Sequence, residues 1–265
     1  MPLQKLKFNP GVDRENTRYA AEGGWYETDK VRFRRGMPQK IGGWVRLSAS
    51  TFLGVCRSML NWVTLQQQNL VSVGTNLKYY IERGGAYFDI TPIRATATLT
   101  NPFTTTLGST TVLVTDNAHG ALQNDFVTFS GASAVGGLTL NGEFQISFVT
   151  ADSYNITAAS QASSGATGGG TVTAAYQVNT GNEIAVPFTG WSAGAWGAGT
   201  WGVGGTTLAP IRLWSQANFG EDLFFGYRGG SLFYWDASTG VNTRAVYVTS
   251  LGGASDVPTI VNKTF

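Results

Sequence analysis

The chain carries almost no helical pattern, and this restricts its fold more than any other feature of the sequence. No window of about twelve residues shows apolar side chains at positions i, i+3, i+4 and i+7 without glycines or β-branched runs. Short apolar or alternating runs separated by Gly and Asn turns are frequent instead, as in residues 69–90. The 35 glycines and the low share of charged residues, 13%, disfavour long exposed helices and coiled coils. The sequence predicts an all-β chain built from antiparallel meanders.

Two segments of the chain resemble each other. Residues 69–80 and 222–235 both read as a polar residue, an apolar run, a glycine, a turn, a leucine and an aromatic pair. Each follows a further strand-like run that ends in Trp62 or Trp214. A strand, a loop and a hairpin repeated in this way are typical of β-propeller blades, although any two hairpins in a glycine-rich chain also look alike. Residues 47–94 and 179–265 are therefore predicted to form a partial, propeller-like blade region.

A segment without basic residues separates the two similar units. Residues 95–182 contain no Lys or Arg, and their four acids are Asp116, Asp125, Glu143 and Asp152. Five or six runs rich in Thr and Val suit short, half-buried strands, among them residues 110–114, 125–129, 142–146 and 154–157. Guest domains are tolerated at exposed loop tips of a host. Residues 95–178 are therefore predicted to be an inserted small β-barrel or sandwich domain.

Residues 1–46 are interpreted as an extended N-terminal arm that docks on other subunits. Residues 1–50 hold ten of the 18 Lys and Arg residues and five acids, a local balance of +5. This mixture favours interchain salt bridges or a solvated face over a dedicated nucleic-acid site, with phosphate contacts as the alternative. The candidate contact residues are basic and aromatic: Arg14, Arg18, Trp25, Arg32, Arg34, Arg35 and Trp44. Residues 31–34 alternate apolar and basic side chains, which predicts a strand with both arginines on one face.

A glycine-rich stretch after the insert carries a tryptophan every five residues, at Trp191, Trp196 and Trp201. Five is the period of neither a helix nor a strand. One interpretation is an irregular loop whose indoles pack on its own glycines. The other is an exposed aromatic loop that docks on a partner subunit, a membrane or a sugar, because Trp is enriched at interfaces.

The sequence carries no recognisable catalytic or cofactor motif. It has one histidine, His119, and one cysteine, Cys56, which excludes zinc sites that need two histidines or a cysteine cluster. His119 lies in a turn-like run and is interpreted as structural. P-loop, dinucleotide and calcium-loop patterns are absent. We expect no enzyme activity, no cofactor and no metal. No apolar run of transmembrane length and no signal peptide occurs, which predicts synthesis in the cytoplasm.

The N-terminal run resembles the opening of the tail nozzle proteins of short-tailed bacteriophages, also called tail-tube or DNA-stabilization proteins. The resemblance rests on Phe8-Asn-Pro-Gly-Val, Gly24-Trp25, Asp29-Lys-Val-Arg-Phe33, Gly36-Met-Pro38 and Gly42-Gly-Trp44. Later runs resemble the propeller blades of that family: Asp89-Ile-Thr-Pro92 and Tyr234-Trp-Asp236. The insert resembles a small β-barrel module of phage virion proteins, in which His119-Gly120 and Asn141-Gly142 would occupy turns.

The resemblance implies a structural virion protein of the phage tail, made in the host cytoplasm. Its subunits would form a homo-oligomeric ring, of six copies, below the portal and adaptor and beside other tail proteins. Phage DNA would pass through the lumen without sequence specificity. The alternative function is a glycan-binding tail adhesin that uses the Trp/Gly loop, and membrane contact by this loop is a third. Two blade-like units and the start of another at residues 257–262 fall short of a full propeller, so a longer natural protein is expected.

Overall fold

The computed structural model describes residues 8–17, 19–20, 22–43, 45–46, 48–181, 211 and 213–264. It divides into two compact units, Met1–Leu47 and Ser48–Phe265. Strands make up the regular structure of the described residues, apart from two single 3-10 turns, η1 (Ala237–Thr239) and η2 (Val248–Ser250). The predicted all-β fold class is confirmed. None of the described helical segments is long and apolar enough to span a membrane.

The first unit is organised by one hairpin and a small aromatic cluster. Strands β1 (Val31–Arg34) and β2 (Met37–Lys40) pair antiparallel with Arg34 opposite Met37. The two turn residues, Arg35 and Gly36, both have positive φ, as a two-residue turn that follows the strand twist requires. Phe33 points to the inner side of β1 and packs near Trp25, with ring centroids 6.1 Å apart.

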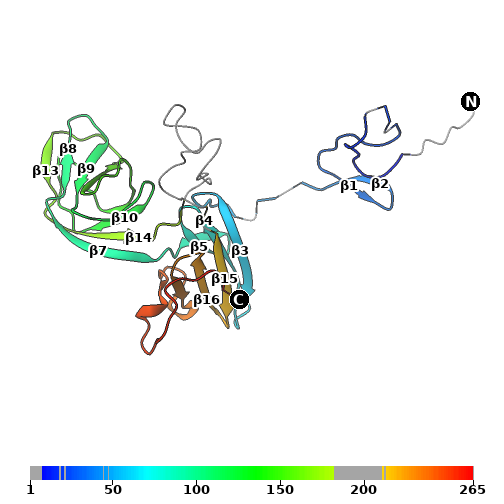
Figure 1. Ribbon diagram of the computed structural model, residues 1–265. Helices are drawn as coiled ribbons and strands as arrows, with labels where there is room; N and C mark the ends of the chain where they lie inside the picture. The colour runs from blue at the N-terminus through cyan, green and yellow to red at the C-terminus, as the bar shows by residue number, and fades with distance from the viewer. Residues whose placement is uncertain are drawn as a thin grey trace, which may run out of the picture. The chain divides into compact units, whose positions relative to one another are not determined.

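The second unit contains two four-stranded antiparallel sheets that pack face to face (Figure 1). The first has β3 (Cys56–Val63), β4 (Asn69–Thr75), β5 (Tyr79–Arg83) and β6 (Ala86–Asp89) in sequence order. The second has β15 (Trp214–Phe219), β16 (Asp222–Tyr227), β17 (Leu232–Trp235) and β18 (Val246–Tyr247), also in sequence order. Each of the two similar sequence segments thus supplies the second and third strands of a meander, which is the strand order of a propeller blade. We call them the blade sheets.

An aromatic core joins the blade sheets. Because side chains alternate between the two faces of a strand, each sheet turns one apolar set toward the other. The buried set comprises Trp62, Leu70, Tyr79, Ile81, Ile90, Val178, Trp214, Leu223, Phe225, Phe233, Trp235 and Ala245. Tyr79 stacks on Phe225 with ring centroids 3.9 Å apart. The indole N–H of Trp214 donates to the carbonyl of Thr75 at 2.7 Å, so this large side chain is buried with its polar atom satisfied.

The insert is a β-sandwich of two four-stranded antiparallel sheets around a separate core. One sheet has the order β11 (Gly142–Gln145), β10 (Phe126–Ser130), β14 (Thr171–Gln177) and β7 (Ile93–Thr100). The other has β12 (Ser153–Thr157), β9 (Thr111–Thr115), β8 (Phe103–Thr105) and β13 (Ala166–Gly168). No sheet of the described residues closes into a barrel. The predicted limits of arm, blade region and insert stay predictions, although the sandwich strands run from residue 93 to residue 177.

The predicted start of a third blade at residues 257–262 forms no strand of its own. Val261 makes only an isolated antiparallel bridge to Gly230: its N–H donates to the Gly230 carbonyl at 2.8 Å, and its carbonyl accepts from the Gly229 N–H at 2.8 Å. The Ser215 hydroxyl lies 2.9 Å from the Thr264 hydroxyl, which keeps this segment against the second blade sheet. The apolar residues that suggested a strand therefore extend an existing sheet by one bridge.

Candidate functional site

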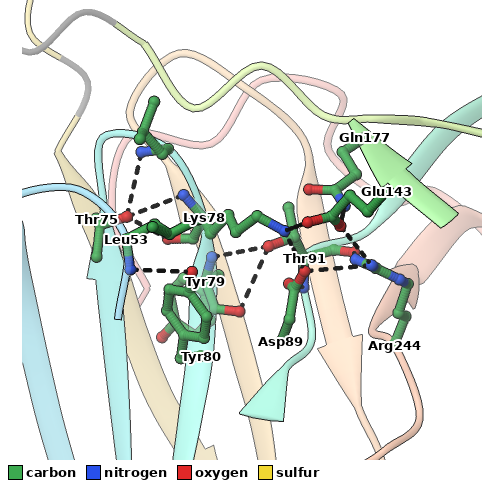
Figure 2. Close-up of polar contacts among 11 residues, drawn as sticks. Leu53, Thr75, Lys78, Tyr79, Tyr80, Asp89, Thr91, Glu143, Gln177 and Arg244 are labelled. Carbon is green, nitrogen blue, oxygen red and sulfur yellow. Dashed lines mark hydrogen bonds and ion pairs between the residues drawn. The ribbon is translucent and has the colours of Figure 1, made fainter. Parts of the chain in front are cut away.

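Four charged side chains meet where the blade sheets adjoin the sandwich (Figure 2). Lys78 lies in the turn that precedes β5, and Asp89 ends β6. Glu143 projects from β11 of the sandwich, and Arg244 lies just before β18 of the second blade sheet. We call these four residues the charge cluster. It brings together side chains from both blade sheets and from the insert.

Each carboxylate of the charge cluster contacts both cations. The Asp89 Oδ2 atom lies 2.6 Å from Lys78 Nζ and 3.2 Å from Arg244 Nη2. Glu143 Oε1 accepts from Lys78 Nζ, and Glu143 Oε2 lies 3.3 Å from Arg244 Nη2. Figure 2 shows Glu143 reaching toward both cations from the sandwich side. Two positive and two negative charges therefore balance within one connected network.

The interior position of Lys78 gives the charge cluster its structural importance. The Lys78 side chain is only 3% exposed, and lysine is almost never this deeply buried unless it is paired. Its ammonium also lies 4.4 Å from the ring centroid of Phe126 in the sandwich. Removing a partner from such a buried cation is costly, because the charge has lost its hydration. The chain thus couples insert and blade sheets through an interaction that is hard to break.

Lys78 and Arg244 lower the pKa of the Asp89 carboxyl. Burial alone would raise the pKa of the Asp89 carboxyl, but Lys78 and Arg244 outweigh it and hold that pKa below its usual value. The Thr91 backbone N–H adds a hydrogen bond to Asp89 Oδ1 at 2.9 Å. Asp89 is therefore ionised over the whole physiological range, and the cluster keeps its charge balance there.

Backbone and amide contacts fix the chain where it crosses between the modules. The Gln177 side-chain amide at the end of β14 donates to Glu143, and the Arg244 guanidinium donates to the Thr91 carbonyl at 2.8 Å. The Val178 N–H donates to the Pro92 carbonyl at 3.0 Å, which ties the outgoing and returning strands of the insert together. The Thr180 hydroxyl donates to the Asn76 carbonyl in the first blade sheet. These hydrogen bonds connect the sandwich and the blade sheets at several points, and we call this contact region the joint.

The four acids of residues 95–182 form hydrogen bonds or ion pairs with other residues of the chain. Asp116 accepts from the Tyr176 hydroxyl at 2.5 Å, and Asp125 accepts from the Leu122 backbone N–H at 2.8 Å. Glu143 belongs to the charge cluster. Asp152 accepts from the Ala118 backbone N–H at 3.0 Å, and Asp152 and Glu143 are the two exposed members of the four. The net negative charge of the insert sequence therefore does not form an acidic surface patch.

His119 has the structural role that its turn-like sequence predicts. Its Nδ1 atom accepts from the Ala121 backbone N–H at 2.9 Å, so the proton of the neutral ring resides on Nε2. Nε2 lies 3.1 Å from the Thr150 carbonyl, to which it donates. Both ring nitrogens are thus engaged in joining two loops of the sandwich. Within the described residues, no group of His, Cys, Asp and Glu side chains could hold a metal ion.

The described contact candidates of the N-terminal unit occupy three different environments. Arg32 and Arg34 are exposed on one side of β1, as the alternation predicts, and Arg35 is in the turn. Arg14 pairs with Glu27 at 3.3 Å on another segment. Trp25 is half-buried near Phe33, as part of the small cluster described above. Arg18, Trp44, Trp191, Trp196 and Trp201 lie outside the described residues.

The charge cluster has no signature in the local sequence. Glu143 is 65 positions from Lys78 and 101 positions from Arg244, so no local motif links them. One signal was available: Glu143 lies in a predicted strand of a segment without basic residues, so a cationic partner had to come from elsewhere. No sequence pattern identifies which cation that is.

The comparisons with known proteins show only weak similarity. No protein-family model matches the chain, and no curated protein sequence matches it. Among solved structures, the chain is similar to the phage phi92 endosialidase, with 16% sequence identity and a TM-score of 0.28. The likeness covers 73% of this chain and 28% of that chain. At this TM-score the two chains need not share a fold.

Proposed function

We propose that the chain is a structural subunit of a phage tail that assembles with copies of itself into a ring-shaped nozzle. DNA would be retained behind this ring and ejected through it. The observation that carries the proposal is the joint between insert and blade sheets, where a charge-balanced cluster around the buried Lys78 connects the two. A contact region held by several interactions suits a subunit that transmits mechanical load. The N-terminal resemblance to tail nozzle proteins supports the same role.

The charge distribution is consistent with a conduit for DNA. Affinity for nucleic acid grows with each phosphate that Lys or Arg neutralises, so a channel wall must carry few free cations. Residues 95–182 contain no Lys or Arg, and Lys78 is paired inside the charge cluster. Arg32 and Arg34, two of the exposed basic side chains of the first unit, are proposed contacts to neighbouring subunits or to the adaptor. The ring would contain six copies and reside in the virion.

Negative-stain microscopy of the full chain tests the proposed function. We expect closed rings, with sedimentation velocity giving one predominant species of about six subunits. Double-stranded DNA should bind weakly and without sequence preference, and this binding should weaken further as salt rises. A chain that stays monomeric at all concentrations would contradict the ring. Saturable binding to host glycans that is lost in Trp196→Ala would support the adhesin instead.

A further inference from the structure

The first unit has little interior of its own. None of the residues that the structure describes between positions 8 and 46 is fully buried. Phe8 packs near Trp25, with ring centroids 6.0 Å apart, yet Phe8 is 53% exposed. Units of this length bury little apolar surface, and a two-stranded hairpin alone is marginally stable in water. A partner surface that covers the first unit would therefore stabilise it.

One face of the β1–β2 hairpin is exposed and cationic. Arg32 and Arg34 lie on this face, and their direct cross-strand neighbours Gln39 and Met37 share it. Met37 is 66% exposed. Within the described residues, neither arginine takes part in an ion pair. We call these four residues the arginine face. Guanidinium groups bind carboxylates and stack on aromatic rings, so the arginine face suits a partner that offers both.

The outer face of the second blade sheet carries a row of apolar side chains, on the side away from the shared core. Phe224, Tyr234 and Val246 are direct cross-strand neighbours on β16, β17 and β18. Phe219 of β15 continues the row, with its ring centroid 6.1 Å from that of Phe224, and Phe224 lies 5.0 Å from Tyr234. Phe219 is 72% exposed and Val246 is 41% exposed. We call these four residues the aromatic row.

Two carboxylates lie at one end of the aromatic row. Asp222 is opposite Phe219 in the register, and its Oδ2 atom accepts from the Tyr234 hydroxyl at 2.6 Å. Asp236 follows β17 directly. The hydrogen bond to Asp222, with burial and the charges of both carboxylates, raises the pKa of the Tyr234 phenol to about 12. Neither Asp222 nor Asp236 belongs to an ion pair of the described residues, so this end of the row carries an uncompensated negative charge.

The other charged side chains near the second blade sheet have different positions. Glu221 accepts from the Leu65 backbone N–H and so reaches toward the first blade sheet. Arg228 directly follows β16, at the end of this strand opposite to Asp222. Lys263 belongs to the segment that contacts Ser215, which is also at that far end. The outer face therefore has an acidic end beside Phe219 and a basic end away from it.

The two units of the chain have opposite net charges. Residues 1–47 contain ten Lys and Arg residues and five acids, a balance of +5. Residues 48–265 hold the other eight of the 18 basic and eleven of the 16 acidic residues, a balance of −3. Complementary charge favours association of unlike surfaces and suppresses association of like ones. The first unit of one copy is thus better matched to the second unit of another copy than to another first unit.

We propose that the arginine face of one copy docks on the aromatic row of the next copy in the ring. Arg32 and Arg34 would meet the acidic end of the row, and Met37 would pack on its rings. Two features select this face among the exposed apolar residues: its side chains contact one another across neighbouring strands, and carboxylates outside any described ion pair border it. Two unlike patches make a head-to-tail contact, which closes a ring when the rotation allows. The inference rests on the proposed ring and assigns its contact.

The test uses the full chain and two variants, each of which changes one patch. Phe219→Arg places a cation in the aromatic row, and Arg32→Glu with Arg34→Glu reverses the charge of the arginine face. Sedimentation equilibrium should show self-association weakened about tenfold or more in each, with an unchanged melting temperature. All three substitutions in one chain place glutamates opposite the new arginine, so this chain should associate more tightly than either variant.

Matched controls place the same charge on other exposed apolar positions. Met59 on β3 is 66% exposed, and Leu107 in the sandwich is 70% exposed. Met59→Arg and Leu107→Arg should leave self-association at the wild-type level, because both residues lie outside the aromatic row.

Trypsin digestion gives a second, independent measurement. Arg32, Arg34 and Arg35 are exposed in the single chain, so trypsin should cleave after them rapidly at concentrations where the chain is monomeric. Assembly covers this hairpin, and cleavage at these positions should slow by about tenfold or more, as expected when cleavage follows the population of the open form. Mass spectrometry of the fragments distinguishes these cuts from those elsewhere in the chain.

Four outcomes would overturn the inference. Wild-type self-association of the double arginine variant would remove the contact but leave the proposed ring intact. Equal weakening by Met59→Arg or Leu107→Arg would show that the effect of Phe219→Arg is not specific to the aromatic row. A lower melting temperature of monomeric Phe219→Arg would show that the chain itself covers the row. Trypsin resistance of a chain that stays monomeric at all concentrations would contradict both the contact between copies and the ring.

Discussion

The indole of Trp214 lies directly against the α-carbon of Gly74. A β-carbon on Gly74 would come within 2.5 Å of Trp214 Cδ1 and within 2.8 Å of Ser58 Oγ. The two residues belong to different blade sheets, and Trp214 is buried between them. Gly74, in the first of the two similar segments, thus leaves the space that is filled by Trp214, which precedes the second segment.

Gly74→Ala should destabilise the second unit. The added methyl group has no room, so the indole or the β4 backbone must move, and overpacking of this kind costs about 1–3 kcal/mol. Urea unfolding followed by tryptophan fluorescence measures the change in the free energy of unfolding. Gly252→Ala is the control, because a β-carbon there meets nothing within 4 Å and it should leave stability almost unchanged.

Glu143→Gln should weaken the joint between insert and blade sheets. Lys78 would keep Asp89 as its only carboxylate within the charge cluster, and an under-compensated buried charge costs about 1–3 kcal/mol. Thermal unfolding by calorimetry measures the loss. Glu27→Gln provides the comparison, because Glu27 belongs to an exposed ion pair that contributes little. Equal effects of the two substitutions would show that the charge cluster does not stabilise the fold.

Acid should remove the contribution of Asp89. Its pKa is lowered in the folded chain, so the unfolded chain binds the proton first, near its usual pKa of about 3.9. The contribution is therefore complete above that value and is lost as the pH falls toward the lower folded pKa. As the pH is lowered below 5, the melting temperature of the wild-type chain should fall more steeply than that of Asp89→Asn. Parallel curves for the two proteins would contradict this assignment.

Tyr176→Phe should destabilise the sandwich. The Tyr176 hydroxyl donates to Asp116 and lies 2.8 Å from the Tyr154 hydroxyl, and burial raises the pKa of both phenols. Its removal leaves the Asp116 carboxylate under-satisfied, at a cost of about 1–3 kcal/mol. Hydrogen exchange of the β14 and β10 amides reports the loss. Tyr87→Phe is the control, since no hydrogen bond of the Tyr87 hydroxyl is seen among the described residues.

The double substitution Arg32→Glu with Arg34→Glu should reduce self-association without changing the melting temperature. Both side chains are exposed on β1, so the hairpin does not need their charge to fold. Arg46→Glu is the control for a single charge reversal, because Arg46 is exposed and lies outside the hairpin. Unchanged ring formation in the double variant, measured by light scattering, would remove the hairpin from the proposed contacts.

Strand positions could be predicted because alternation is local. The runs around residues 110–114, 125–129 and 154–157 each form a strand, and so does the alternating run 31–34. The sequence does not predict the three-residue strands β8 and β13, because these runs are too short to show alternation and become strands by pairing with each other. Residues 257–262 do not form the predicted start of a third blade. Apolar residues predict a strand even where no neighbouring strand is available to pair with it.

The candidate site could not be predicted in the same way. The charge cluster depends on how the sandwich and both blade sheets pack, which is a property of the whole unit. Lys78 looks like an ordinary solvent-facing turn residue in the sequence, and its burial follows from Phe126 and Glu143 of the insert. Only the imbalance of charge in residues 95–182 indicated that an acid there needed a distant partner.

The insertion of the sandwich between the blade sheets has a consequence for biosynthesis. Trp214 lies 139 positions after its partner Thr75, so a ribosome adding about 5–20 residues per second makes the second blade sheet roughly 7–28 s after the first. During that interval the first sheet has no partner for Trp62, Leu70 and Ile81. The apolar face of the first blade sheet therefore stays uncovered by its partner sheet during this interval, whereas every residue of the sandwich core, up to Tyr176, is synthesised before the second blade sheet.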